Sequence, residues 1–507
     1  MLDIVFCSLP YSNLDHIYSA PAILKGVVEA NGFRAKTIDF GCELLNQVDR
    51  NENKFNQAQL YFISTDKQNQ NQEQEQDIRL FYSNCINFFK KNPSKYIGIS
   101  VFSIYTHRAV YELCKLIKEE QIESKIIIGG RGAKVPCFYS IINNYNITGT
   151  DKLASFGSLL QKRKLIDYLI LGDGEDAILQ ILNNKELKTD NFQSDEFRSP
   201  VPDYSDYNFK NYLFTDEVML PVTGSKGCVR DCDFCDVKFQ FGNYRYRSGK
   251  AIAQELITIS QKFGIYKFQF TDSLVNGGLK PFREFLTELS EYNLQNPDQK
   301  ITWNGQYICR PELQSHLDLY PLMRDAGAHG LTIGVESGSN KVLAAMNKNT
   351  TVEALYAELE NFRKNNITCM LLTFTGHWSE TWEDFLEHCK MFINIAPYVR
   401  LGTVSGVSLG ILYSLLDGTP SMFNHKLNSV EFDPDYKEHF WINKNNPGNT
   451  FKERLYRRLL LLKLCQELNI PTVADKEIIM HYIDVVNTSF ETINDFYKKY
   501  SGELVHY

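Results

Sequence analysis

The stretch from Gly227 to Cys235 reads GCVRDCDFC, and the interpretation of the rest of the chain starts from it. Its three cysteines, Cys228, Cys232 and Cys235, have the spacing C-x3-C-x2-C and follow an apolar segment that predicts a β-strand. Three thiolates on one loop can bind three irons of a 4Fe-4S cube and leave the fourth iron without a protein ligand. The motif therefore predicts an iron-sulfur cluster whose open iron is free to hold a substrate or a second cofactor.

Two other interpretations of the cysteines stay open at this point. A structural zinc site normally takes four Cys or His ligands, but the nearest histidines, His107 and His329, lie roughly a hundred residues away. Buried thiols without a ligand are common, but the charged neighbours Arg230, Asp231 and Asp233 do not fit a core strand. The two aspartates are expected to be surface charge.

Composition places the chain among soluble globular proteins. Its 507 residues predict two to four domains, and 43% of them are apolar and 23% charged. The net charge of −7 argues against broad binding to DNA or to an anionic membrane. The N-terminus lacks the basic region of a secretory signal, and the longest uncharged stretch, Leu401 to Leu416, is too short to span a bilayer. A cytoplasmic protein with mostly reduced cysteines is predicted.

Residues 1–185 alternate short apolar runs with helical patterns, which predicts a doubly wound parallel sheet of the Rossmann or flavodoxin type. Loops at the carboxyl ends of such strands form the ligand crevice. The polar segment Lys67–Gln76 is expected to be a mobile loop, and residues 186–217 to be a linker. The predicted strands are Ile4–Ser8, Ala35–Asp39, Ile97–Phe102, Ile126–Gly129 and Tyr168–Leu171.

Residues 218–425 repeat a cleaner strand-helix period, and six such units predict an incomplete (β/α)6 barrel. The predicted strands are Met219–Thr223, Lys267–Phe270, Ile301–Asn304, Gly330–Val335, Thr368–Phe374 and Thr403–Leu412. The predicted helices are Lys250–Phe263, Pro281–Asn293, Pro311–Ala326, Val352–Asn365 and Thr381–Ile395.

Residues 426–507 are predicted to be helical, with a basic helix at Thr450–Leu468 and one or two further helices at Lys476–Tyr500. The arginines at 454, 457 and 458 could contact RNA, but such a run more often forms a solvated face over a packed one.

With Phe234 placed just before its last cysteine, the motif resembles that of the radical S-adenosylmethionine (radical SAM) superfamily. In that family the open iron binds the amino and carboxylate groups of SAM. The run from Leu331 to Lys348 is also similar to the family consensus. The resemblance implies SAM contacts from Phe234, Thr271, Asp272, Ser273, Glu336, Ser337 and Gly376.

The resemblance also implies roles for these residues. Phe234 would shield the cluster, Thr271–Ser273 would bind the SAM amino group, and Glu336 would accept hydrogen bonds from the ribose hydroxyls. A simple helix cap is the alternative for Thr271–Ser273. The segment Gly376–Glu380 keeps the Gly and Glu of the family's Gly-x-Pro-Gly-Glu motif but has Trp and Ser in place of Pro and Gly. The turn there is expected to differ from that of the family.

Residues 1–180 resemble the cobalamin-binding-type domain of a large radical SAM subgroup, on the Gly and Pro residues that end the predicted strands. The Asp-x-His motif that supplies a lower histidine ligand to cobalt does not occur in the sequence, so no such histidine is expected. The resemblance implies cobalamin contacts from Pro10, Tyr11, Ser103, Tyr105, Gly130, Arg131, Gly172 and Gly174.

The expected function is a radical SAM enzyme that cleaves SAM to a 5′-deoxyadenosyl radical and, with cobalamin, methylates an unactivated carbon. The alternatives are a cobalamin-independent rearrangement, cyclisation or oxidation, and, from another class, a non-catalytic metal-stabilised binding protein. Methylthiotransferases match less well, because the N-terminal cysteines lack the arrangement of their second cluster. The expected partners are an external electron donor of the flavodoxin or ferredoxin type and a small-molecule or peptide substrate rather than RNA, with no membrane or DNA partner.

Overall fold

The computed structural model of the chain describes residues 1–64, 72–148, 151, 154–185, 191–192, 201–214, 217–310, 316–410, 413, 419–432 and 441–473. The chain divides into two compact units, Met1–Pro221 and Val222–Tyr507. No helix in these described ranges is both long and apolar enough to cross a membrane.

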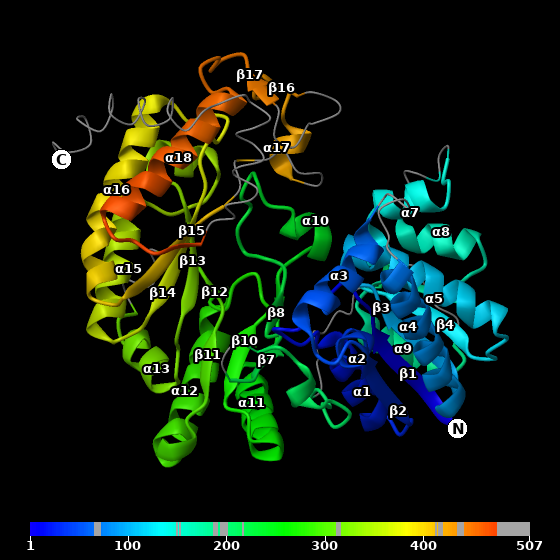
Figure 1. Ribbon diagram of the computed structural model, residues 1–507. Helices are drawn as coiled ribbons and strands as arrows, with labels where there is room; N and C mark the ends of the chain where they lie inside the picture. The colour runs from blue at the N-terminus through cyan, green and yellow to red at the C-terminus, as the bar shows by residue number, and fades with distance from the viewer. Residues whose placement is uncertain are drawn as a thin grey trace. The chain divides into compact units, whose positions relative to one another are not determined.

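The unit Met1–Pro221 is built on one parallel sheet with the strand order β2-β1-β3-β4-β5-β6 (Figure 1). This order reverses between β1 and β3, as in doubly wound flavodoxin-like folds, so the predicted fold class is confirmed. The strands are β1 Leu2–Ser8, β2 Ala35–Asp39, β3 Ser94–Ser100, β4 Lys125–Gly129, β5 Tyr168–Gly172 and β6 Asn191–Phe192.

Apolar residues on both faces of the strands explain why helices cover both sides of this sheet. Phe6 of β1 packs in one buried cluster with Val28 and Ile178. Val5 and Cys7, which point to the opposite face, are also fully buried. The helices are α1 Ala20–Ala30, α2 Phe40–Gln47, α3 Glu52–Ile63, α4 Gln72–Lys91, α5 His107–Glu119, α6 Arg131–Lys134, α7 Tyr139–Asn144, α8 Phe156–Lys162 and α9 Gly174–Leu182.

The prediction of a mobile loop at Lys67–Gln76 is wrong for residues 72–76, which form the start of α4. Residues 65–71 lie outside the described residues. Gln and Glu are good helix formers, and further along α4 the side chains of Phe81, Cys85 and Phe89 are buried. Packing of that apolar face stabilises the helix, and the polar segment extends it toward the N-terminus.

The second unit has a series of strands in chain order, with helices between most successive strands. They form two sheets, β11-β10-β7 and β12-β13-β14-β15-β18, and neither closes on itself within the described residues. The predicted incomplete barrel is therefore confirmed. The strands are β7 Met219–Val222, β10 Lys267–Phe270, β11 Thr302–Asn304, β12 Gln306–Tyr307, β13 Leu331–Glu336, β14 Cys369–Thr373, β15 Val404–Leu409 and β18 Thr472–Val473.

Gly305 separates the two sheets: β11 ends just before it, as the predicted strand Ile301–Asn304 does, and β12 begins just after it. A Cβ atom at Gly305 would lie 2.7 Å from Cγ1 of Val275 and 2.8 Å from Cβ of Phe270. Only glycine allows this close approach, which is typical of a bend in a curved sheet.

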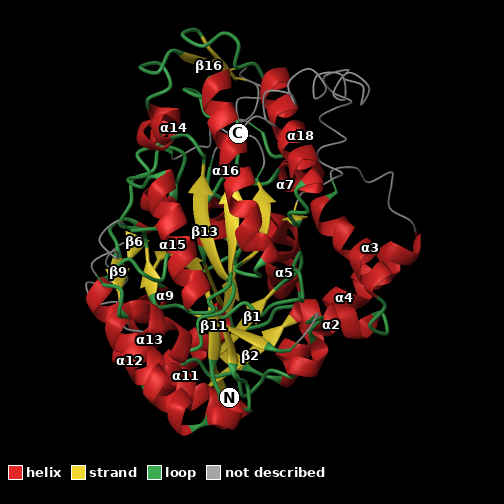
Figure 2. Cartoon of the chain, turned by 90° about the vertical axis from the view of Figure 1, so that its left-hand side faces the viewer, coloured by secondary structure: helices red, strands yellow, loops and turns green. Residues whose placement is uncertain are grey.

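Helices of the second unit lie along the outside of its strands, and Figures 1 and 2 both show α15 and α16 running beside β13 to β15. The prediction of a helix from Pro311 is wrong for His316–Asp318, where Leu317 is exposed and the chain turns before α13; residues 311–315 lie outside the described residues. The helices are α10 Val237–Phe241, α11 Gly249–Phe263, α12 Leu279–Gln295, α13 Leu319–Asp325, α14 Asn340–Ala345, α15 Val352–Lys364 and α16 Trp382–Arg400.

The C-terminal region contains the predicted basic helix, observed as α18 Phe451–Glu467, and also a short antiparallel pair, β16 Val430–Phe432 and β17 Trp441–Asn443, after α17 Pro420–Phe423. The expectation of further helices at Lys476–Tyr500 falls outside the described residues.

The prediction of a solvated basic face on α18 is wrong, because Arg454, Arg457 and Arg458 are at most 3% exposed. Arg458 donates to the carbonyl of Leu409 at the end of β15 (2.8 Å), and Arg457 pairs with the Glu380 carboxylate (2.8 Å). These guanidinium groups satisfy polar groups inside the unit, so the run offers no support for RNA binding.

Candidate active site

The three cysteines lie on the loop between β8, Ser225–Lys226, and α10, shortly after the carboxyl end of β7. Cys232 is buried, whereas Cys228 and Cys235 are partly exposed. Within the described residues, no group of three or more His, Cys, Asp or Glu side chains is arranged around a single metal ion. A donor set of three thiols on one loop fits a cluster, where each thiolate binds a different iron, and is one ligand short of the four that a structural zinc site normally takes.

Electrostatics on the loop oppose ionisation of the thiols in the absence of metal. Burial raises the pKa of all three, and together with the charge of the other two cysteines it raises that of Cys232 to about 12. The Lys348 ammonium group acts in the opposite direction on each thiol. Because iron binds the thiolate, metal binding here must release protons, and Lys348 lowers the cost of doing so.

Glu336 ends β13 and forms a buried ion pair with Lys348, with Oε1 and Nζ 2.7 Å apart and the side chains 11% and 10% exposed. Gly334 makes room for the pair, since a Cβ atom there would lie 2.5 Å from Glu336 Oε1. Glu336 itself has a φ of +69°, at a register shift between β13 and β14. Strained backbone of this kind is concentrated at functional sites.

Lys348 also lies 5.6 Å from the ring centroid of Phe234, so the structure brings the cysteine loop and the end of β13 together around one lysine. Lys348 lies within the run that is similar to the family consensus, but the sequence alone predicts no role for it. The available signal was chemical: a lysine in an otherwise buried segment needs an anionic partner.

Two of the predicted SAM-binding residues that follow β10, Thr271 and Asp272, differ in exposure. Thr271 is exposed, and its hydroxyl lies 2.8 Å from that of Thr223. Asp272 is buried, and its carboxylate accepts hydrogen bonds from the N–H of Gly224 and the hydroxyl of Ser225, both at 2.7 Å. Burial raises the pKa of Asp272 to about 7. Asp272 thus fixes the segment that leads into the cysteine loop.

Ser337 and Gly376 lie at the ends of β13 and β14, at the same edge as the cysteine loop. Ser337 is fully buried, and its hydroxyl accepts a hydrogen bond from the N–H of Ser339 (3.2 Å). Gly376 has a φ of +87°, and a Cβ atom there would lie 2.2 Å from Cδ of Arg454. The N–H of Gly376 donates to the Glu380 carboxylate (3.2 Å), so the Gly and Glu of the partly matched motif contact each other.

Asp233 is not surface charge as predicted, although Asp231 is. The Asp231 carboxylate pairs with Lys238 at 3.2 Å, and both side chains are about half exposed. The Asp233 side chain is 14% exposed and accepts hydrogen bonds from His377 and Trp378. Burial acts to raise the pKa of Asp233, but the contacts with His377 outweigh it and the pKa is lowered, so this carboxylate is ionised.

The residues predicted to contact cobalamin lie on four loops that follow β1, β3, β4 and β5, which are adjacent strands of one parallel sheet. Their side chains therefore gather at its carboxyl edge. The Tyr11 and Tyr105 rings lie 5.8 Å apart, and Tyr18 lies 4.5 Å from Phe102. Tyr105 is 44% and Phe102 53% exposed, so this edge presents aromatic faces to a ligand.

The glycines at this edge are required by backbone conformation and by close packing within the unit. Gly130 has a φ of +101°, and a Cβ atom there would lie 2.6 Å from the carbonyl of Val101. Gly172 also has a left-handed φ, of +117°, and a Cβ atom at Gly174 would lie 3.3 Å from Leu24. Loop packing alone therefore accounts for these glycines, so they do not indicate a bound ligand. The exposed aromatic rings are the feature of this edge that fits one.

The two histidines of this unit, His16 and His107, have different environments. His107 is fully buried, with Nε2 2.8 Å from the carbonyl of Gly132 and Nδ1 accepting from the N–H of Phe138 (3.1 Å). Burial lowers its pKa to about 4. His16 is exposed, and its Nδ1 lies 2.6 Å from the Asp15 carboxylate.

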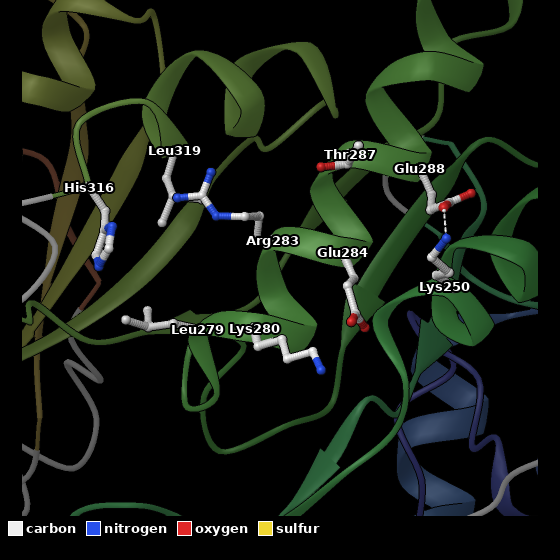
Figure 3. Close-up of a pocket in the computed structure, with 9 residues that line it drawn as sticks. All are labelled: Lys250, Leu279, Lys280, Arg283, Glu284, Thr287, Glu288, His316 and Leu319. Carbon is white, nitrogen blue, oxygen red and sulfur yellow. Dashed lines mark ion pairs between the residues drawn. The ribbon is translucent and has the colours of Figure 1, made fainter.

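A cavity of about 400 Å³ lies elsewhere in the second unit, on the outer surface of α11 and α12 (Figure 3). It is lined mainly by charged side chains, among them Lys250 and Glu288, which form an ion pair at 2.9 Å. No predicted site residue lines this cavity. We therefore place the chemistry at the cysteine loop and not at this cavity.

Comparisons with known proteins give a matching family model and several relatives. Residues 222–392 match the family model of the Radical SAM superfamily. The anaerobic magnesium-protoporphyrin IX monomethyl ester cyclase of Cereibacter sphaeroides is 25% identical over 264 residues, which cover 46% of this chain and 42% of that protein. The chain thus aligns with less than half of the relative's length.

Two solved structures share the fold across both units. The radical S-adenosylmethionine methyltransferase TsrM from Kitasatospora setae, solved with cobalamin and a [4Fe-4S] cluster, matches 86% of this chain and 80% of its own with a TM-score of 0.57 and 15% identity. The cobalamin-dependent S-adenosylmethionine radical enzyme OxsB, solved with aqua-cobalamin and S-adenosylmethionine, matches 96% and 71% with a TM-score of 0.60 and 14% identity.

Residues 222–392 of the second unit therefore form a radical SAM domain, as the cysteine motif predicts.

Proposed function

We propose that the protein is a radical SAM enzyme that binds a 4Fe-4S cluster and SAM in its second unit and cobalamin in its first, and that it methylates an unactivated carbon. The observation that carries the radical SAM part is the meeting of the cysteine loop with the Glu336–Lys348 pair. The cobalamin part rests on the exposed aromatic edge of the flavodoxin-like sheet and on the fold shared with TsrM and OxsB.

In this proposal each residue of the second unit has a physical task. Cys228, Cys232 and Cys235 hold the cluster, which when bound supplies the electron for reductive cleavage of SAM. Lys348 offsets the negative charge of the buried thiolates and fixes Oε1 of Glu336. The remaining oxygen of Glu336 is then oriented to accept hydrogen bonds from the ribose hydroxyls, which bind a charged acceptor more strongly than a neutral one.

In the first unit, the exposed rings of Phe102 and Tyr105 would pack against the face or edge of a corrin ring. Cobalamin, when bound, supplies the methyl group. The sequence lacks the Asp-x-His motif, and both ring nitrogens of His107 have protein partners, so the proposal includes no histidine below cobalt. His16→Ala tests this: the variant is expected to bind cobalamin as the parent does.

The experiment is anaerobic purification, reconstitution with iron and sulfide, and titration with hydroxocobalamin, followed by absorption spectra and gel filtration. The proposal expects one cobalamin to co-elute per chain, without the spectrum of a histidine nitrogen on cobalt. Failure of the folded, cluster-containing protein to bind any cobalamin would contradict the methyltransferase proposal.

That outcome would favour a second candidate, a cobalamin-independent rearrangement, cyclisation or oxidation by the same radical. The observation that supports this candidate is the 25% identity to the anaerobic magnesium-protoporphyrin IX monomethyl ester cyclase. Formation of 5′-deoxyadenosine without cobalamin, and loss of hydrogen from the substrate without methylation, would identify it.

A further inference from the structure

Asp233 stands between the second and third cysteines and is held by three separate parts of the second unit. Its backbone N–H donates to the carbonyl of Met346 (2.9 Å), and its carbonyl accepts from the N–H of Ser421 (2.8 Å). Its Oδ2 lies 2.9 Å from Nε2 of His377 and accepts from Nε1 of Trp378 at 3.0 Å.

His377 and Trp378 are themselves fixed by the C-terminal region, and the Tyr413 hydroxyl is a third, longer donor to Asp233 Oδ2, at 3.5 Å. Asn449 donates from its side chain to the carbonyl of His377 (2.7 Å), and Asn443 donates to the carbonyl of Trp378 (2.8 Å). Both asparagines are at most 2% exposed. A continuous set of hydrogen bonds therefore leads from the C-terminal region, through the turn after β14, to the cysteine loop.

This set depends on the residues by which the turn departs from the family motif. Trp378 stands where the family usually has proline, which has neither a side-chain donor nor an N–H. The departure thus supplies a donor to the cysteine loop, while Gly376 and Glu380 keep their mutual contact.

We propose that Asp233 is a positioning residue for the cluster, which fixes the cysteine loop in its iron-binding shape through His377 and Trp378. This inference rests on the proposed binding of a cluster by the three cysteines. Pre-ordering a metal-binding loop removes part of the entropy cost of binding, and groups that hold the ligands commonly change metal affinity when removed. The C-terminal region then contributes to cluster retention without touching the cluster.

The test compares three variants of Asp233 contacts with one matched control. Asp233→Ala removes the acceptor, Asp233→Asn keeps one acceptor oxygen, and Trp378→Phe removes one donor while keeping an aromatic ring. The control is Asp231→Ala, which removes an equal charge from the same loop but loses only an exposed ion pair.

The measurement is the rate at which each reconstituted protein releases iron to a chelator, with the electron paramagnetic resonance spectrum of the reduced cluster and circular dichroism of the apoprotein. Asp233→Ala is expected to release iron about tenfold faster than the parent, equivalent to about 1.4 kcal/mol. The iron-release rates of Asp233→Asn and Trp378→Phe should lie between those of the parent and Asp233→Ala. The rate of Asp231→Ala should stay within about twofold of that of the parent.

Iron release from Asp233→Ala at the rate of Asp231→Ala, with the same resonance spectrum, would overturn the proposal while leaving the proposed function intact. If Asp233→Ala does not fold, Trp378→Phe decides: faster release with unchanged circular dichroism supports the proposal, and parent-like release overturns it. A folded parent protein that binds no cluster would overturn the proposed function and this inference together.

Discussion

Lys348→Met tests the electrostatic centre of the site. The substitution keeps the length and apolar stem of the side chain but leaves the Glu336 carboxylate buried without its cation. Both side chains are about nine-tenths buried and 2.7 Å apart, and removing one partner of such a pair costs about 3–5 kcal/mol. The expected loss of stability is about 3 kcal/mol, the lower end of that range.

The assay is urea unfolding of the apoprotein followed by tryptophan fluorescence. All four tryptophans belong to the unit Val222–Tyr507, so the signal reports on that unit alone. The double variant Lys348→Met with Glu336→Gln removes both charges and should recover about 2 kcal/mol relative to additive single losses. Parent-like stability of Lys348→Met, or additive losses in the double variant, would refute the account of a coupled buried pair.

Three further predictions concern other positions. His388 is fully buried, neither ring nitrogen has a hydrogen-bond partner in the described part of the chain, and burial lowers its pKa to about 3. The unfolded chain takes up a proton at His388 with a pKa of about 6.5, and the folded chain does not, so protonation favours the unfolded state as pH falls below that value. His388→Leu removes this effect, so the stability lost between about pH 7 and about pH 5.5 in urea unfolding should be about 1 kcal/mol smaller than in the parent. Gly376→Ala should destabilise the second unit by about 1–3 kcal/mol, since it combines a left-handed φ with a contact to Arg454; an unchanged urea midpoint would contradict this. Tyr105→Ala together with Phe102→Ala should weaken cobalamin binding about tenfold or more, measured by equilibrium titration, while iron content stays at the parent value; equal cobalamin affinity would remove the aromatic edge from the site.

The parts of the fold that sequence predicts well are those set by local pattern. Strands such as Ala35–Asp39 and Lys267–Phe270 have the predicted bounds, because each is a short apolar run between turn signals. The cysteine motif is equally local, since its three ligands share one loop. The start of α4 was less predictable, because a polar segment becomes helical only through the packing of the apolar residues that follow it.

The parts that sequence could not supply depend on contacts between distant segments. Asp231 and Asp233 are two residues apart and chemically identical, yet one is exposed and the other is held by His377, more than a hundred residues away. The arginines of α18 have the composition of a solvated face, and only their buried carbonyl and carboxylate partners show otherwise. A charged residue in a sequence is therefore expected to be exposed only when the fold brings no hydrogen-bond or ion-pair partner to it.

The central claim is that the cysteine loop holds a cluster that cleaves SAM. Its most direct test is to reconstitute the parent protein and Cys232→Ala anaerobically, count the iron bound, and measure 5′-deoxyadenosine after adding SAM and a strong reductant. The account predicts about four irons per parent chain and 5′-deoxyadenosine formation, with both lost in Cys232→Ala. A Cys232→Ala protein that keeps its iron and forms 5′-deoxyadenosine at the parent rate would contradict it.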